Sequence, residues 1–210
     1  TPVANKHDLG FTFDRSGRKI YFLRCDDNGT RFTNPILYRV TAGDANSAVQ
    51  LTQSGDLGTT YEFQSGSPLP TNDGVLIHAN LTGGVGEGEK ILKVTDAGVV
   101  SDYLVSVDGK RFADPIIKRY SDLGDILFTV TLPFGFSGLG QNYISAFPIV
   151  NGVPNEADER IIMTAQGDSA LRGIVLNENG TNLGANKIYS GIDSLAGRTI
   201  DGNLKQVVQE

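Results

Sequence analysis

The hydrophobic residues of this chain lie in short runs that are rich in β-branched and aromatic side chains. Residues 19–23 and 125–130 are typical, and each run is flanked by Gly, Asp or Asn, which favour turns. Few windows show the apolar spacing of three and four residues that marks an amphipathic helix. The pattern therefore predicts an all-β chain.

The strand pattern recurs four times along the sequence. In each copy a turn leads into a strand, a long polar loop follows, and two further strands complete the unit. The second strand of each copy ends at a glycine, and these glycines lie 55, 54 and 45 residues apart: Gly43, Gly98, Gly152 and Gly197. A period of about 50 residues with several short strands is typical of β-propeller blades.

We therefore predict a single β-propeller domain over residues 1–210, with about four blades. It would be either a complete ring or part of a larger or paired propeller. The approximate units are 8–54, 60–106, 111–166 and 168–210. One small sheet cannot bury both of its faces, whereas sheets stacked around an axis share a continuous core. A β-sandwich, whose strands also recur with turn signals, is the alternative fold.

The first unit carries a motif that points to a family. A Ser16-Gly17-Arg18-Lys19 turn opens the strand, and Gln50-Leu51-Thr52 closes the unit. The second unit keeps Asn72-Asp73-Gly74, and the third keeps only Gly124. This arrangement resembles the TolB-type, WD-like propeller repeat. The resemblance implies a propeller fold and implies no particular activity, because such repeats serve many functions.

The longest loop of each unit falls between its first two main strands, at 26–34, 80–88, 131–140 and 177–185. Long loops at one repeat position project on one face, which is often the binding face. We expect these loops to contact a partner through five side chains: Arg31, Phe32, Phe134, Phe136 and Asn182. The alternative for the two phenylalanines of the third loop is that they fold back and plug the propeller channel.

The first loop also suggests a metal site. Asp26, Asp27 and Asn28 collect hard oxygen ligands beside a glycine, as calcium requires, although the EF-hand spacing is absent. These residues are a weak calcium candidate, and no other cofactor is expected. Three loops contain the Asn-x-Ser/Thr triplet that accepts glycans in secreted proteins, at Asn28, Asn80 and Asn179.

Composition excludes several classes of protein. The chain has two histidines, one cysteine and no tryptophan, so it can form neither an internal disulfide nor a four-ligand zinc site from Cys and His alone. A net charge of −6 argues against nucleic-acid binding. No run approaches the roughly 18 apolar residues of a membrane span, so no membrane insertion is expected.

No convincing catalytic constellation is present. Gly135-Phe136-Ser137-Gly138 lacks the last glycine of a nucleophile elbow, and we interpret Cys25 as a small strand residue. Sugar-binding sites commonly stack rings on tryptophan, which this chain lacks.

The expected function is therefore that of a non-catalytic, extracytoplasmic propeller. It would act as a protein-interaction or self-assembly module through its long loops, with another protein or copies of itself as partner. The alternatives are a carbohydrate-binding module, with a glycan as partner, and a glycosidase-like enzyme fragment. The expected location is extracellular, cell-surface or periplasmic.

Overall fold

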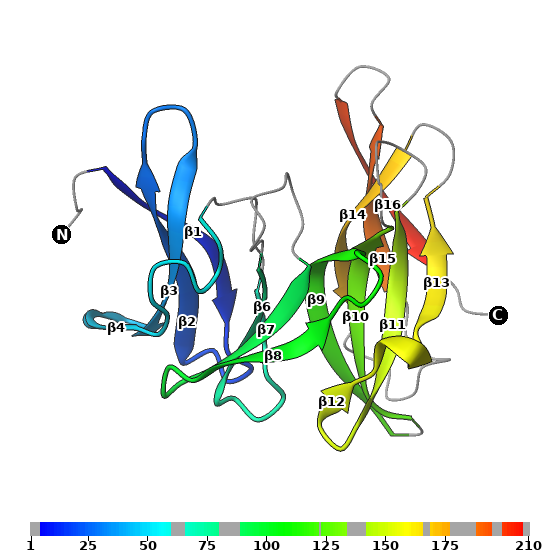
Figure 1. Ribbon diagram of the computed structural model, residues 1–210, viewed down its shortest axis with the longest axis horizontal. Helices are drawn as coiled ribbons and strands as arrows, with labels where there is room; N and C mark the ends of the chain where they lie inside the picture. The colour runs from blue at the N-terminus through cyan, green and yellow to red at the C-terminus, as the bar shows by residue number, and fades with distance from the viewer. Residues whose placement is uncertain are drawn as a thin grey trace. The chain divides into compact units, whose positions relative to one another are not determined.

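A computed structural model describes most of the chain, as antiparallel strands with a single helical turn in the described part (Figure 1). The described residues are 5–59, 66–79, 89–121, 123–133, 142–165, 169–176, 188–194 and 199–207. The chain divides into two compact units, Thr1–Val105 and Ser106–Glu210. The prediction of an all-β chain is confirmed.

The first unit contains two four-stranded antiparallel sheets whose strands are adjacent in chain order. One sheet comprises β1 (Lys6–Phe13), β2 (Lys19–Asp27), β3 (Phe32–Thr41) and β4 (Asp44–Gln50). The other comprises β5 (Gly66–Pro68), β6 (Gly74–Ala79), β7 (Lys90–Thr95) and β8 (Val100–Val105). Each sheet is thus a meander, which is the connectivity of a propeller blade.

The second unit repeats this plan. Its larger sheet comprises β9 (Arg111–Tyr120), β10 (Gly124–Leu132), β11 (Tyr143–Val150), β12 (Val153–Pro154) and β13 (Arg160–Thr164), with β12 and β13 both paired to β11. A 3-10 turn, η1 (Glu156–Asp158), precedes β13. The last sheet comprises β14 (Ser169–Leu176), β15 (Ile188–Ser194) and β16 (Thr199–Val207).

The four sheets span residues 6–50, 66–105, 111–164 and 169–207, beside predicted units of 8–54, 60–106, 111–166 and 168–210. That all four belong to one domain stays a prediction. Each of the first three sheets also has a strand that the three-strand repeat omitted, namely β1, β5 and β9. These strands precede the turn from which the repeat is counted.

The glycines that set the repeat share one backbone conformation. Gly43, Gly98 and Gly152 have φ values of 85°, 79° and 81°, and each sits in the turn after β3, β7 or β11. Positive φ is the left-handed region that glycine enters without steric cost. The fourth glycine of the series, Gly197, lies outside the described residues.

Each unit has its own core between its two sheets. In the first unit, Tyr21, Leu23 and Cys25 of β2 pack in one cluster with Val75 and Ile77 of β6. In the second, a cluster joins the sheet of β9–β13 to β14, with Phe128, Ile144 and Leu171 among its members. Among the described residues, no helix is long and apolar enough to span a membrane.

Candidate functional site

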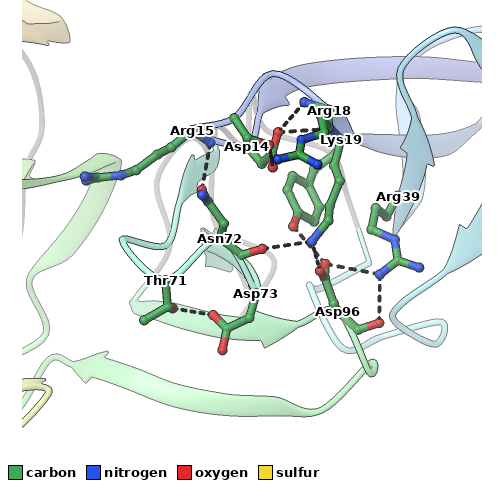
Figure 2. Close-up of polar contacts among 11 residues, drawn as sticks. Asp14, Arg15, Arg18, Lys19, Arg39, Thr71, Asn72, Asp73 and Asp96 are labelled. Carbon is green, nitrogen blue, oxygen red and sulfur yellow. Dashed lines mark hydrogen bonds and ion pairs between the residues drawn. The ribbon is translucent and has the colours of Figure 1, made fainter.

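A polar cluster among the described residues of the first unit joins its two sheets (Figure 2). We call it the junction cluster: Lys19, Tyr21, Arg39, Asn72 and Asp96. Asp96 follows β7, and its carboxylate accepts a hydrogen bond from the Tyr21 hydroxyl at 2.8 Å. The same carboxylate forms ion pairs with Lys19 and with Arg39, the latter at 3.3 Å. The Lys19 ammonium also donates to the Asn72 carbonyl oxygen at 2.8 Å. These contacts link residues that are 53 to 77 positions apart in the chain.

The turn before β2 is organised by a buried carboxylate. Asp14 accepts hydrogen bonds from the backbone N–H groups of Arg18 and Lys19, at 2.8 and 2.9 Å, and from the Ser16 hydroxyl. Gly17 takes the left-handed conformation in this turn, with φ at 70°. The Ser16–Lys19 motif is therefore a turn that positions Lys19 for the junction cluster.

Burial and charge act in opposite directions on these carboxyl groups. Burial alone would raise the pKa of Asp96, but hydrogen bonds from Lys19 and Tyr21 and the nearby cationic charges bring it below its usual value. Asp14 behaves in the same way, because its hydrogen bonds from Ser16, Lys19 and Arg18 outweigh the effect of burial on its pKa. Both groups are thus stabilised as carboxylates in the folded state.

Acid is expected to destabilise the first unit through these two groups. A lowered folded-state pKa means that the stabilisation is present above the ordinary value of 3.8 and is lost as the pH falls through the folded value. In thermal unfolding followed by circular dichroism, Tm should therefore fall more steeply below about pH 4 than between about pH 7 and pH 5. The fall of Tm below about pH 4 should be less steep in Asp96→Asn, because one of the two carboxyl groups is absent there and no longer titrates. An identical profile in the variant would contradict this role of Asp96.

The second unit has a comparable charged cluster. Lys110 contacts Asp108, Glu156 and Glu159 at 3.1, 3.2 and 2.8 Å, and Glu159 accepts a hydrogen bond from the Ser145 hydroxyl. Burial would lower the pKa of Lys110, but the hydrogen bonds to the acids raise it. Both clusters use their charged groups to hold strands and turns of one unit together, so we interpret them as structural.

The strongest candidate for a binding surface lies on the opposite side of the first sheet from the core. We call it the outer face, and it carries Phe11, Phe13, Ile20, Phe22, Arg24 and Tyr38. Strand β2 alternates between the two sides: Tyr21, Leu23 and Cys25 point into the core cluster, so Ile20, Phe22 and Arg24 point away from it. The β1 residue Phe13 is paired with Ile20 and shares its side of the sheet.

The outer face is built from stacked rings and a cation. Phe22 and Tyr38 are cross-strand partners whose rings stack with centroids 5.6 Å apart, and Phe11 lies 6.2 Å from Phe22. The Arg24 guanidinium carbon is 5.5 Å from the centre of the Phe22 ring and 5.0 Å from that of Tyr38. Its Nε and Nη2 atoms donate to Asp8 at 2.7 and 2.8 Å. This contact combines cation–π attraction with a bidentate ion pair.

The same face is hollowed beside projecting aromatic side chains. A groove of about 700 Å³ runs over it, lined by the apolar residues Ile20, Phe22, Val40 and Ala48 and by the charged residues Lys6, Asp8, Arg24 and Asp44. Phe11 and Phe13 stand next to this groove with 65% and 56% of their surface exposed. A contiguous exposed apolar surface with a rim of charged side chains is typical of an interaction site.

The first predicted loop is well ordered by local hydrogen bonds. Asn28 accepts from the backbone N–H groups of Thr30 and Arg31, both at 3.0 Å, and the Arg31 side chain is exposed. Phe32 is half-buried: its ring lies 4.9 Å from that of His7 and packs against the core cluster. Arg31 is therefore accessible to a partner, whereas Phe32 has a packing role in the sheet.

The calcium candidates have protein partners. Asp26 forms an ion pair with Lys6 and accepts from the Asn34 amide at 3.1 Å, and Asp27 lies 3.1 Å from the His7 imidazole. Within the part of the chain that the structure describes, no group of three or more His, Cys, Asp or Glu residues is arranged to hold a metal ion. A calcium site that includes Asn28 stays a prediction.

Five other predicted residues lie outside the described residues: Phe134, Phe136, Asn182, Asn80 and Asn179. Of the predicted glycan acceptors, Asn28 is described and exposed. Contact with a partner, and glycosylation at these positions, stay predictions.

Cys25 and His78 of the first unit are both buried in strands. Cys25 is fully buried, and burial, with the nearby charges of Asp26 and Asp8, raises the pKa of its thiol to about 12. Very little reactive thiolate would exist at neutral pH. His78 lies in β6 and is only 1% exposed. These positions agree with the interpretation of Cys25 as a small strand residue.

The outer face was not predicted from the sequence, because functional residues were expected in the long loops. Phe11, Phe13, Phe22 and Tyr38 all belong to strands, where apolar residues are expected to serve the core. One signal was available: β2 has apolar residues on both of its sides, as Ile20 and Phe22 alternate with Tyr21 and Leu23. A sheet with two apolar faces must cover both of them.

Comparison with known proteins supports the architecture. No protein-family model and no curated protein sequence matches this chain. A solved prolyl endopeptidase, from a study of inter-domain dynamics in catalysis and specificity, matches over 100% of this chain with 12% identity and a TM-score of 0.50. A puromycin-hydrolysing peptidase of Mycobacterium tuberculosis matches over 96% with 11% identity and a TM-score of 0.46.

The chain spans only 30% and 32% of the length of these two peptidase chains. At such low identity the likeness concerns the fold alone. The meander sheets of the described residues and the match to a chain that contains a propeller domain agree with each other. This protein therefore has an all-β, β-propeller-like fold.

Proposed function

We propose that this chain is a non-catalytic protein-interaction module whose binding surface is the outer face of the sheet β1–β4. The observation that carries the proposal is the exposure of Phe11 and Phe13, at 65% and 56%, beside the groove over Phe22. Aromatic side chains that project from a rigid sheet serve well as anchors, because little conformational entropy is lost when they bind.

The surroundings of the outer face support protein as the ligand. Most of its polar groups are already paired within the chain, Arg24 with Asp8 and Tyr38 with Gln50 at 3.1 Å. The face therefore presents apolar area with few unpaired charges, as the centre of a protein interface does. The buried thiol of Cys25 and the buried position of His78 favour a non-catalytic role. The acidic pI of about 4.9 and the loop composition favour an extracytoplasmic location.

Site-specific photo-crosslinking tests this function. A photoreactive phenylalanine analogue replaces Phe13 in the full chain, in cells that naturally make it, and the same analogue replaces Val107 as the control. Val107 is 86% exposed but lies outside the outer face. We expect a protein adduct of defined mass from position 13 that is absent from position 107 and is lost when Phe11→Ser is added.

Three results would count against the proposal. One is the absence of any adduct at position 13 above the level of the control. Another is turnover on a panel of chromogenic glycosides, which would favour the glycosidase-like alternative. The third is binding to a glycan array that disappears in Phe11→Ser, which would make the outer face a carbohydrate site.

A further inference from the structure

We propose that the partner of the outer face is a second copy of this chain, bound face to face about a twofold axis that runs along the strands. This inference rests on the proposed function, which it narrows to one occupant. In the proposed dimer, Phe11 and Phe13 of each copy enter the groove of the other.

The sheet β1–β4 has the composition of a sheet that is packed on both sides. Its inner side contributes Tyr21, Leu23 and Leu37 to the core shared with β6 and β7. Its outer side carries Ile20, Phe22 and Val40 in the same strands. A sheet that is apolar on both sides buries both of them. The outer face therefore fits burial against another sheet.

At the level of Phe13 the groove lies over β2, β3 and β4, whereas Phe13 projects from β1 at the opposite edge; the other end of the groove is lined by Lys6 and Asp8 of β1. Phe13 projects from β1 and is paired with Ile20, which is paired in turn with Val40 of β3. Ile20 and Val40 line the groove, as does Ala48 of the edge strand β4. A twofold axis parallel to the strands exchanges the two edges and preserves the level along the strand. It therefore brings Phe13 of one copy over Val40 and Ala48 of the other, which is the self-complementarity of a twofold interface.

The charges of the outer face permit this contact. The chain has a net charge of −6, but the bases on this face are neutralised locally, Arg24 by Asp8 and Lys6 by Asp26, and Asp44 at the β4 edge adds one further acid to the groove lining. The proposed axis exchanges the two edges, so the two copies of Asp44 do not face each other and like-charge repulsion across the contact stays small. A strongly acidic or strongly basic partner would gain little here, because the ions of these two pairs already have partners.

The area of the outer face determines how tightly the two copies are expected to bind. Four strands spaced by about 4.8 Å and about eight residues long cover roughly 500 Å² per copy, or about 1,000 Å² in total. This area lies at the lower limit of specific interfaces. We therefore expect a reversible dimer with a dissociation constant on the order of micromolar.

Sedimentation equilibrium of the full chain from about 1 to about 300 µM tests the dimer. The natural chain should pass from monomer to dimer over this range. The double variant Phe11→Ser/Phe13→Ser should weaken association at least tenfold, because it removes four exposed rings from the interface. Ala48→Arg should weaken association as strongly, because the larger charged side chain would occupy the groove that receives Phe13. Circular dichroism establishes that each variant keeps its strands, and both substitutions lie on exposed side chains.

The matched control is Val107→Ser/Val153→Ser, which also removes two exposed apolar side chains, at 86% and 57% exposure, but from the second unit. It should dimerise like the natural chain. A natural chain that stays monomeric throughout the range overturns the proposal, as does a dimer that the Phe11 and Phe13 substitutions leave unchanged. A monomeric chain that still crosslinks another protein through position 13 would overturn this inference alone and leave the proposed function standing.

Discussion

Gly74→Ala is expected to destabilise the first unit by about 3 kcal/mol, because the new methyl group has no space. A Cβ atom at Gly74 would lie 2.2 Å from the Val94 carbonyl oxygen and 2.9 Å from the Thr95 Cα atom. Both are backbone atoms of β7, and β7 is held in register with β6 by pairing from Gly74–Thr95 to Ala79–Lys90. The clash can be relieved only by separating two strands of the core.

Chemical denaturation followed by circular dichroism measures this loss of free energy, and in thermal unfolding Tm should fall by roughly 15 °C. Gly29→Ala is the control, because Gly29 has φ at 85° and a Cβ atom added there would meet nothing within 4 Å. It suffers backbone strain alone, which costs about 1 kcal/mol. If the two variants lost equal stability, the close approach at Gly74 would not be the cause.

Asp96→Ala is expected to cost about 2 to 3 kcal/mol, because it leaves three groups of the junction cluster without their shared acceptor. Lys19 and Arg39 would keep positive charges in a partly buried site, and the Tyr21 hydroxyl would lose its acceptor at 2.8 Å. The Asp96 side chain is only 20% exposed, so water replaces it poorly. Denaturant unfolding of this variant gives the change in free energy directly.

Asp102→Ala is the matched control for this prediction. Asp102 is also paired with a lysine, Lys90 at 2.9 Å, but its side chain is 52% exposed. Exposed pairs of this kind contribute about 0 to 1 kcal/mol. A loss at Asp96 no larger than that at Asp102 would mean that the junction cluster does not hold the two sheets together.

The turn motifs of the first two units can be located from the local sequence, but the roles of their glycines cannot. Gly17 and Asn72 both have positive φ, at 70° and 57°, and each lies two residues before its strand begins. The glycine of Asn72-Asp73-Gly74 therefore serves a different purpose from Gly17, since it makes room for β7. The repeat in the sequence locates both turns. It cannot show that one glycine is required for its positive φ and the other for the lack of space around its Cα atom.

The closing motif of the first unit has a similar explanation. Leu51 is buried in the core cluster, and the Thr52 hydroxyl accepts a hydrogen bond from the Leu37 N–H at 2.8 Å. Gly98 of the second sheet packs close to the Leu51 carbonyl oxygen, which would lie 3.1 Å from a Cβ atom there. The sequence shows this motif only as a pattern, and its contacts explain why a leucine and a threonine stand there.

The sequence by itself determined the strands, the turns and the repeat, because alternation and left-handed glycines are local properties of the chain. Only the tertiary structure decided which side of β2 enters the core. Ile20 and Phe22 are as hydrophobic as Tyr21 and Leu23, so alternation could not choose between them. The choice depends on residues of β6 and β7 that lie about 50 or more positions away, and it leaves Phe11 and Phe13 of the outer face exposed.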